Sequence, residues 1–182
     1  SDDLSGQTIG DYRFLRQIGS GSLGTVYQAL HIGDQQHRAI KVIHSNISEG
    51  AAFQATFAEM MPQLAALDHA HIMRVMDYET DPHYMIIMEY ITGESLKNHI
   101  TNLEQNQQQW SFFDIARFGI QVSDALKYAH GHDILHRALK PQNIMFRTPL
   151  MQQAFQVAVG DFGSDYLLSM APITPITTPA SL

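Results

Sequence analysis

The order of apolar and polar positions in the first half of the chain predicts a sheet of short β-strands. Alternating runs, several of them separated by glycine or Asp-Pro turns, cover residues 12–18, 25–30, 38–43, 75–79 and 84–89. Between the third and fourth runs, apolar side chains recur at helical spacing, which predicts one helix over residues 51–67. Pro62 lies inside it, and because proline lacks the amide hydrogen that the helix needs, we expect a bend there.

A longer helical pattern opens the second half of the chain. Ser111 followed by Asp114 resembles a capping box, and the apolar positions after it form one face of a helix that we expect to end before Gly131. Gly119 lies on this face, and because glycine inside a helix is less stable than alanine by about 1 kcal/mol, we expect another element to pack closely there. The proline-rich residues 171–180 predict an extended tail.

Length and composition limit the chain to one domain or two small lobes. Of its 182 residues, 45% are hydrophobic and 16% charged, enough for one sizeable core. A formal net charge of −7 argues against a nucleic-acid partner, because binding to a phosphate backbone relies on lysine and arginine. The absence of cysteine excludes disulfides and thiolate metal sites, and it suits a reducing compartment.

Membrane targeting is not predicted by any segment of the sequence. The N-terminal residues are acidic and polar, unlike a secretory signal. The longest apolar stretch, residues 84–91, is interrupted by Glu89 and is far too short to cross a bilayer. We therefore expect a cytoplasmic domain without membrane contact, and the alternative is a piece of a longer membrane-anchored chain.

A glycine-rich string at residues 19–26 is the first motif that points to chemistry. Its pattern, G-x-G-x-x-G-x-V, lies between two strand patterns and lets backbone amides approach a phosphate without a Cβ in the way. A dinucleotide-binding fold would need a strand and then a helix here, and the lysine-containing ending of a P-loop is absent. By itself the string fits a hairpin turn equally well. The next strand carries Lys41 among apolar residues, where its ammonium group needs an anionic partner such as phosphate.

Two further motifs follow in order, HRALKPQN at residues 136–143 and DFG at residues 161–163. With them, the chain resembles the protein kinase family, especially bacterial kinases of the eukaryotic Ser/Thr type. The resemblance implies an α+β, protein-kinase-like fold. A five-stranded antiparallel N-lobe with one helix would cover residues 1–91, and a shortened, mainly helical C-lobe would cover residues 92–182.

The resemblance also implies a site for ATP and Mg²⁺ between the lobes. It assigns the phosphates to Gly19, Gly21, Gly24 and Lys41, and Mg²⁺ to Asn143 and Asp161. It places Met88 at the gatekeeper position and implies that the backbone from Glu89 to Ile91 forms hydrogen bonds with adenine. It also implies that the base lies between the side chains of Val26, Ala39 and Met145. The spacing between Asn143 and Asp161 implies an enlarged hairpin near residues 148–155.

The chain departs from the family pattern at the catalytic base. Ala138 stands where the family has the aspartate of H-R-D, whereas Lys140 of the same loop is retained. A methyl group accepts no proton, and the loss of a general base typically lowers a rate by about 10²- to 10⁴-fold. The resemblance therefore implies that no catalytic set is intact.

A second departure concerns the charge partner of Lys41. Met60 stands where the family has a helix glutamate, and Glu59 lies about 100° round the helix from it. We expect Asp161 to be the counter-charge of Lys41 when no nucleotide is bound. Glu59 turned inward is the alternative.

The family pattern continues beyond Leu182 with further helices, so part of the apolar face of helix 111–130 is expected to lack cover within the chain. Exposed apolar patches usually mark interfaces. We expect a protein partner or a second copy of the chain to cover this face and the C-terminal tail.

Together these features predict a pseudokinase-type domain that binds nucleotide for regulation or interaction. The first alternative is an active Ser/Thr protein kinase in a shortened form that carries an Asp-to-Ala change at position 138. Met60, Pro62 and the early end of the chain are not explained by one inactivating change, which favours the first interpretation. The second alternative is a scaffold module that holds no nucleotide.

Overall fold

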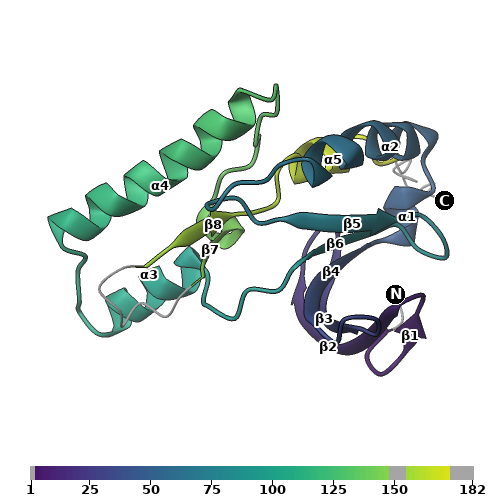
Figure 1. Cartoon of the computed structure of the whole chain (residues 1–182), viewed down its shortest axis with the longest axis horizontal. Helices are drawn as coiled ribbons and strands as arrows, with labels where there is room; N and C mark the ends of the chain where they lie inside the picture. The colour runs from purple at the N-terminus through teal and green to yellow at the C-terminus, as the bar shows by residue number, and fades with distance from the viewer. Residues whose placement is uncertain (1–2, 148–154, 173–182) are drawn as a thin grey trace, which may run out of the picture.

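The computed structural model describes residues 3–147 and 155–172. In chain order its elements are β1 (Thr8–Ile9), β2 (Tyr12–Ser20), β3 (Gly24–His31), β4 (His37–Ile43), α1 (Ser45–Ser48), α2 (Ala51–Ala65), β5 (Val75–Glu79), β6 (Met85–Glu89), α3 (Leu96–Gln105), α4 (Phe112–His130), the 3₁₀ turn η1 (Pro141–Asn143), β7 (Ile144–Phe146), β8 (Val157–Val159) and α5 (Ser164–Ser169). Figure 1 shows a curled sheet with α2 beside it, and α3, α4 and the β7–β8 hairpin toward the other end of the molecule. The enlarged hairpin and the extended tail fall almost entirely outside the described residues.

The main sheet contains all five predicted strands and one short addition, β1. Its strands pair antiparallel in the order β1-β2-β3-β4-β6-β5. Every residue of β4 from Arg38 to Ile43 is buried, because both faces of the sheet are covered. One core cluster, which includes Phe14 and Tyr27, fills one face. A second cluster joins the other face to α2.

An apolar stripe on α2 packs against the sheet. Its fully or nearly fully buried members, three or four residues apart, are Phe53, Phe57, Met61 and Leu64. The ring of Phe57 meets that of Tyr84 edge-on at 5.1 Å. The helix runs through the exposed Pro62 as one element, close to the predicted span, and the bend at this proline stays a prediction.

The helix α4 is anchored at its start and along one side. The Asp114 amide donates to Ser111 Oγ at 3.1 Å, and the Ser111 hydroxyl donates to the Asp114 carboxylate at 2.6 Å, which confirms the predicted cap. On the packed side, the Gln121 amide group accepts from the Val157 amide at 2.8 Å and donates to the Phe155 carbonyl at 3.1 Å. These bonds fasten β8 to the helix.

The other side of α4 carries exposed apolar side chains. The large ones, with exposed fractions from 55% to 81%, are Phe112, Phe113, Ile115 and Ile120. Of the apolar face predicted to lack cover in part, Phe112 and Ile115 are exposed, whereas Val122, Ala125 and Ala129 are buried. The close packing predicted at Gly119 is wrong for the described residues, because this glycine faces the exposed side and a Cβ on it would meet no atom within 4 Å. No helix within residues 3–147 or 155–172, α4 included, has the length and apolarity needed to cross a membrane.

Three helices of the described residues, α1, α3 and α5, have no counterpart among the predicted elements. The start of α3 carries a recognisable signal, since the Asn98 amide donates to Ser95 Oγ at 3.2 Å and Leu96, Ile100 and Leu103 recur at helical spacing. The six residues of α5 are too few for a periodic pattern.

The link from β6 to α3 passes against β7. A Cβ on Gly93 would lie 1.7 Å from the Phe146 carbonyl oxygen, and the Phe146 amide donates to the Glu94 carbonyl at 2.9 Å. Only glycine permits this approach, which joins the sheet to the second half of the chain.

Two glycine substitutions test these contacts. Gly93→Ala should lower the free energy of unfolding by about 1–3 kcal/mol, because the new methyl group collides with the Phe146 backbone. Gly119→Ala should raise it by about 0.5–1 kcal/mol, because alanine is the better helix former and the position is open. Urea unfolding followed by circular dichroism measures both, and a Gly93→Ala protein as stable as the wild type would contradict the close approach.

Candidate nucleotide-binding site

A cavity of about 410 Å³ opens between the glycine-rich turn and the HRALKPQN loop. Its walls come from the β2–β3 turn, β4, the residues around η1, and the start of α5. The residues predicted for this site that line it are Gly19, Gly21, Gly24, Val26, Lys41, Lys140, Asn143 and Asp161. The fold thus gathers the motifs of both halves of the sequence around one cavity.

Of the residues predicted to enclose and bond the adenine base, only Val26 lines this cavity within the described part of the chain. Ala39 pairs with Met88 across β4 and β6. The other three, Glu89, Ile91 and Met145, lie at the end of β6, in the link after it and on β7. The phosphate side is therefore the part of the predicted site that the structure forms as one cavity.

The glycine-rich turn is fixed by a close approach and by one side chain. A Cβ on Gly24 would lie 2.2 Å from the Val42 carbonyl oxygen, whereas a Cβ on Gly21 would meet no atom of the described residues within 4 Å. His44 donates from Nε2 to the Gly21 carbonyl at 2.9 Å, and its amide donates to the Leu23 carbonyl at 3.1 Å. The tip of the turn is thereby held beside the end of β4, with its backbone open.

The buried cation Lys41 is paired with Asp161. The lysine side chain is 9% exposed, and its Nζ lies 2.7 Å from Asp161 Oδ1. This ion pair confirms Asp161 as the predicted counter-charge of Lys41. The alternative prediction, in which Glu59 turns inward to pair with Lys41, is wrong. Removal of Asp161 would leave the buried ammonium group without a counter-charge, so Lys41 depends on this acid.

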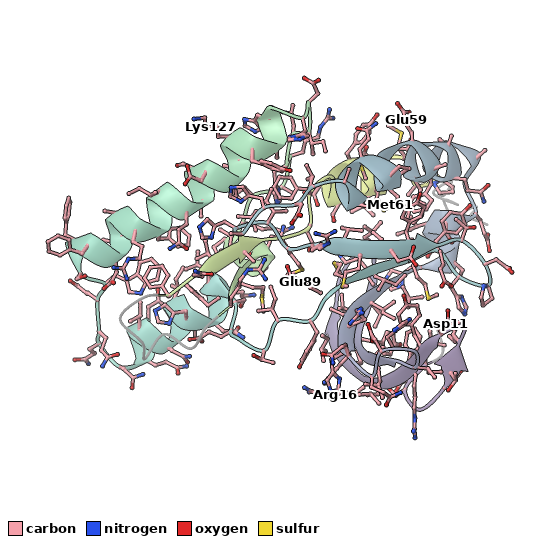
Figure 2. All side chains as sticks on the ribbon, viewed as in Figure 1. Asp11, Arg16, Glu59, Met61, Glu89 and Lys127 are labelled. Carbon is pink, nitrogen blue, oxygen red and sulfur yellow. The ribbon has the colours of Figure 1, made fainter. Side chains whose placement is uncertain are left out.

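Met60 of α2 packs against the DFG segment. A Cβ on Gly163 would lie 2.7 Å from Met60 Sδ, so the thioether packs directly on this glycine. Glu59 is exposed on the outer side of α2, away from the sheet (Figure 2). The contact between α2 and the DFG segment is therefore apolar, which explains why Lys41 takes its partner from elsewhere.

A hydrogen-bond network holds the HRALKPQN loop. His136 is buried, and its Nδ1 accepts from the Ala138 amide at 3.1 Å, so its Nε2 carries the hydrogen that it donates to the Gly160 carbonyl at 2.6 Å. Asn143 Nδ2 donates to the Ala138 carbonyl at 2.8 Å. The main chain of Ala138 is fixed on both sides, while its side chain offers only a methyl group.

The short helix α5 brings a carboxylate to the cavity. Asp165 lines it, and its Oδ1 lies 4.0 Å from Lys140 Nζ, with both side chains about half exposed. On another side, the Arg137 guanidinium lies over the Tyr166 ring at 4.4 Å. These two contacts connect α5 to the HRALKPQN loop.

The donor set of the cavity fits a nucleoside triphosphate with Mg²⁺. Lys41 and Lys140 supply positive charge, and the glycines of the turn let a phosphate approach its backbone closely. Asn143 uses its Nδ2 on Ala138, which leaves its Oδ1 as an acceptor. Together with the Asp161 carboxylate it offers the oxygen ligands that Mg²⁺ prefers.

Comparison with known families agrees with this geometry. The protein kinase domain family matches residues 12–174. The chain belongs to the protein kinase family. Its α+β, protein-kinase-like fold is thereby confirmed, with β1 and the helices α1, α3 and α5 beyond the elements predicted for it.

Characterised kinases align with most of this kinase chain. PrkC, a Ser/Thr-protein kinase of Bacillus subtilis, is 32% identical over 173 residues, which are 94% of this chain and 25% of PrkC. PknF, a Ser/Thr-protein kinase of Mycobacterium tuberculosis, is 30% identical over 159 residues, 87% of this chain and 33% of PknF. The carbon catabolite-derepressing protein kinase of Saccharomyces cerevisiae is 28% identical over 165 residues, 90% of this chain and 24% of that protein. The chain thus spans about a quarter to a third of the length of these kinases.

A solved kinase structure has the same fold. The crystal structure of the Mycobacterium tuberculosis PknI kinase domain superimposes with a TM-score of 0.74 at 27% sequence identity. The match covers 87% of this chain and 62% of the PknI chain.

Two residues of this kinase site, His44 and Asp165, lie outside the motifs that predicted the rest. Nothing in the sequence marks His44, because its contact with Gly21 depends on where β4 ends beside the turn. Asp165 carries a weak signal, an acidic residue just after DFG, but only the fold of α5 brings it toward Lys140.

His136 is expected to make the stability of the kinase fold depend on pH. Burial is the main cause that lowers the pKa of its imidazole below the ordinary value of about 6.5, so the native chain binds fewer protons than the unfolded chain as the pH falls past that value. The stabilisation is complete above this pH and is lost as the pH falls toward the lower pKa of the folded state. His136→Phe should flatten this slope, although it also removes two hydrogen bonds.

Denaturant unfolding at several pH values between about 5 and 8 measures the slope. His130→Gln, at the exposed end of α4, is the matched control. Burial also lowers the pKa of His69, but this residue is present in all three proteins, so the difference in slope isolates His136. Equal slopes in the wild type and in His136→Phe would contradict the assignment.

Proposed function

We propose that this kinase domain binds a magnesium–nucleotide complex as a regulatory or interaction domain of the pseudokinase type, without phosphoryl transfer. One observation carries the proposal. The cavity retains Lys41, Asn143 and Asp161 around an open glycine-rich turn, while Ala138 occupies the position of the proton-accepting aspartate in the kinase loop.

Each retained residue has a role that its chemistry supports. The glycine-rich turn and Lys41 would hold the phosphates, and Asn143 and Asp161 would hold Mg²⁺. The bound Mg²⁺ supplies charge neutralisation for the phosphate oxygens. Lys41 and Asp161 are bonded to each other through one carboxylate oxygen, so binding would draw Lys41 toward phosphate and Asp161 toward the metal.

An active Ser/Thr protein kinase that carries an Asp-to-Ala change at position 138 is the first alternative. It is supported by the relatives PrkC and PknF, which are named Ser/Thr-protein kinases. The contact between Met60 and Gly163 counts against it, because a change at position 138 does not account for an apolar residue where the family has its glutamate.

A scaffold module that holds no nucleotide is the second alternative. The Lys41–Asp161 pair supports it, because the two charges already satisfy each other.

For all three interpretations, we propose that the exposed apolar surface of α4 contacts a protein partner or a second copy of the chain. This surface is formed by Phe112, Phe113, Ile115 and Ile120.

Nucleotide should raise the thermal stability of the domain. At 100 times its dissociation constant, Mg·ATP is expected to stabilise the native chain by about 2.7 kcal/mol, which thermal shift detects as a higher Tm. Lys41→Met should abolish the shift because it removes the phosphate-binding cation. Lys127→Met, on the exposed side of α4 (Figure 2), is the matched control and should keep it. No shift of the wild-type Tm at millimolar ATP would reject nucleotide binding and favour the scaffold.

Restoration of the acid should not restore phosphoryl transfer. Ala138→Asp places a carboxylate in the loop, but residue 60 is still a methionine, so Lys41 still has no glutamate partner on α2. We expect no labelling of a basic protein substrate from radioactive ATP. Strong labelling by Ala138→Asp, absent from the Ala138→Asp Asp161→Asn double variant, would show that the base alone was missing and would support the active-kinase alternative.

A further inference from the structure

The side chain of Arg147 joins three separate segments of the chain. Its Nη1 and Nη2 donate to the two carboxylate oxygens of Glu89, the second at 2.8 Å. Its Nε donates to the Ala70 carbonyl at 2.9 Å, and Nη2 also donates to the Ile72 carbonyl at 3.0 Å. The planar guanidinium thus connects the end of β7 to the end of β6 and to the loop after α2.

Glu89 is bound from a further direction as well. Its Oε1 accepts from the Arg74 amide at 2.8 Å, and its own amide donates to the Arg74 carbonyl at 3.0 Å. The side chains of Glu89 and Arg147 are 26% and 22% exposed, so they are partly shielded from water. Bidentate pairs with this geometry are stronger and more directional than exposed surface pairs, which contribute about 0–1 kcal/mol.

The position of Glu89 connects these hydrogen bonds to the proposed nucleotide site. Glu89 lies between the sheet and the β7–β8 hairpin (Figure 2), and it begins the stretch from Glu89 to Ile91 whose backbone is assigned to adenine. The Arg147 side chain donates to four acceptor atoms, and these hydrogen bonds leave the backbone at Glu89 little freedom to move relative to β7 or to the loop after α2. Lysine could not replace Arg147, because a single ammonium group lacks the planar fork.

We propose that Arg147 is a positioning residue of the nucleotide site, which holds the Glu89–Ile91 backbone in place for the adenine base. This inference rests on the proposed nucleotide binding and deepens it. Arg147 acts through Glu89 and does not line the cavity that contains Lys41 and Asp161. Its effect is therefore expected on recognition of the base and not on recognition of the phosphates.

The test uses Arg147→Met, which removes the charge, and Arg147→Lys, which keeps it and loses the fork. Glu89 and Arg147 border a cavity of about 310 Å³, so water can reach the Glu89 carboxylate and both variants should fold. Arg74→Met is the matched control, because its side chain pairs with Asp68 at the surface while its backbone bonds to Glu89 remain.

The first measurement is hydrogen exchange of the peptides around residues 68–74 and 86–93, without nucleotide. Both Arg147 variants should exchange faster there than the wild type, whereas Arg74→Met should match the wild type. Unchanged exchange in Arg147→Met would overturn the positioning role, and wild-type behaviour of Arg147→Lys would overturn the requirement for the fork. This measurement does not depend on whether ATP binds.

The second measurement is calorimetric binding of Mg·ATP and of magnesium tripolyphosphate. Arg147→Met should weaken ATP about tenfold, equivalent to about 1.4 kcal/mol, with little change for tripolyphosphate. Equal weakening of both ligands, or of neither, would overturn the role in base recognition. A wild type that binds neither ligand would reject the proposed function and with it this role, while the exchange result still decides whether Arg147 holds the segment.

Discussion

The ammonium group of Lys41 is the constraint on which the arrangement of the site depends. It lies on β4, whose burial on both faces keeps its nitrogen from bulk water, so the chain must supply an opposite charge. Asp161 supplies it from the segment after β8, with a backbone φ of +60°. This left-handed conformation is uncommon outside glycine, although aspartate tolerates it better than most residues, and the ion pair offsets its strain. One electrostatic requirement thus sets the direction of the chain at DFG.

The segment that follows takes its shape from the same requirement. Gly163 has a φ of +71°, which only glycine adopts readily, and α5 begins directly after it. The missing Cβ also lets Met60 pack against the turn. A glutamate at position 60 would compete with Asp161 for Lys41, whereas a thioether cannot. The ion pair, the apolar contact and α5 therefore form one unit, in which a change at any member disturbs the other two.

Much of this fold could be predicted from the sequence because the strands and the two longer helices bury periodic apolar positions, such as Phe53 and Phe57 of α2. The Lys41–Asp161 pair was also predictable, since a cation in an apolar strand needs an acid and the motifs offered few. The contacts of His44 and Arg147 were not predictable, because they join segments brought together only by folding and neither residue belongs to a motif. The error at Gly119 has another cause: a glycine lowers helix stability wherever it lies, so its presence does not identify what packs against it.

The HRALKPQN loop shows why binding and transfer can be separated in this fold. Its shape depends on His136, Asn143 and the main chain of Ala138, none of which needs a carboxylate at position 138. Alanine at this position offers no proton acceptor, and it leaves Asn143 and Asp161, the proposed metal ligands, in place. The Lys41–Asp161 pair determines how a bound nucleotide could act on the fold. A nucleotide that draws the two charges apart would replace one ion pair with two new interactions. It could shift the unit that contains α5 only by the difference in its affinity for the arrangements with the ion pair intact and broken.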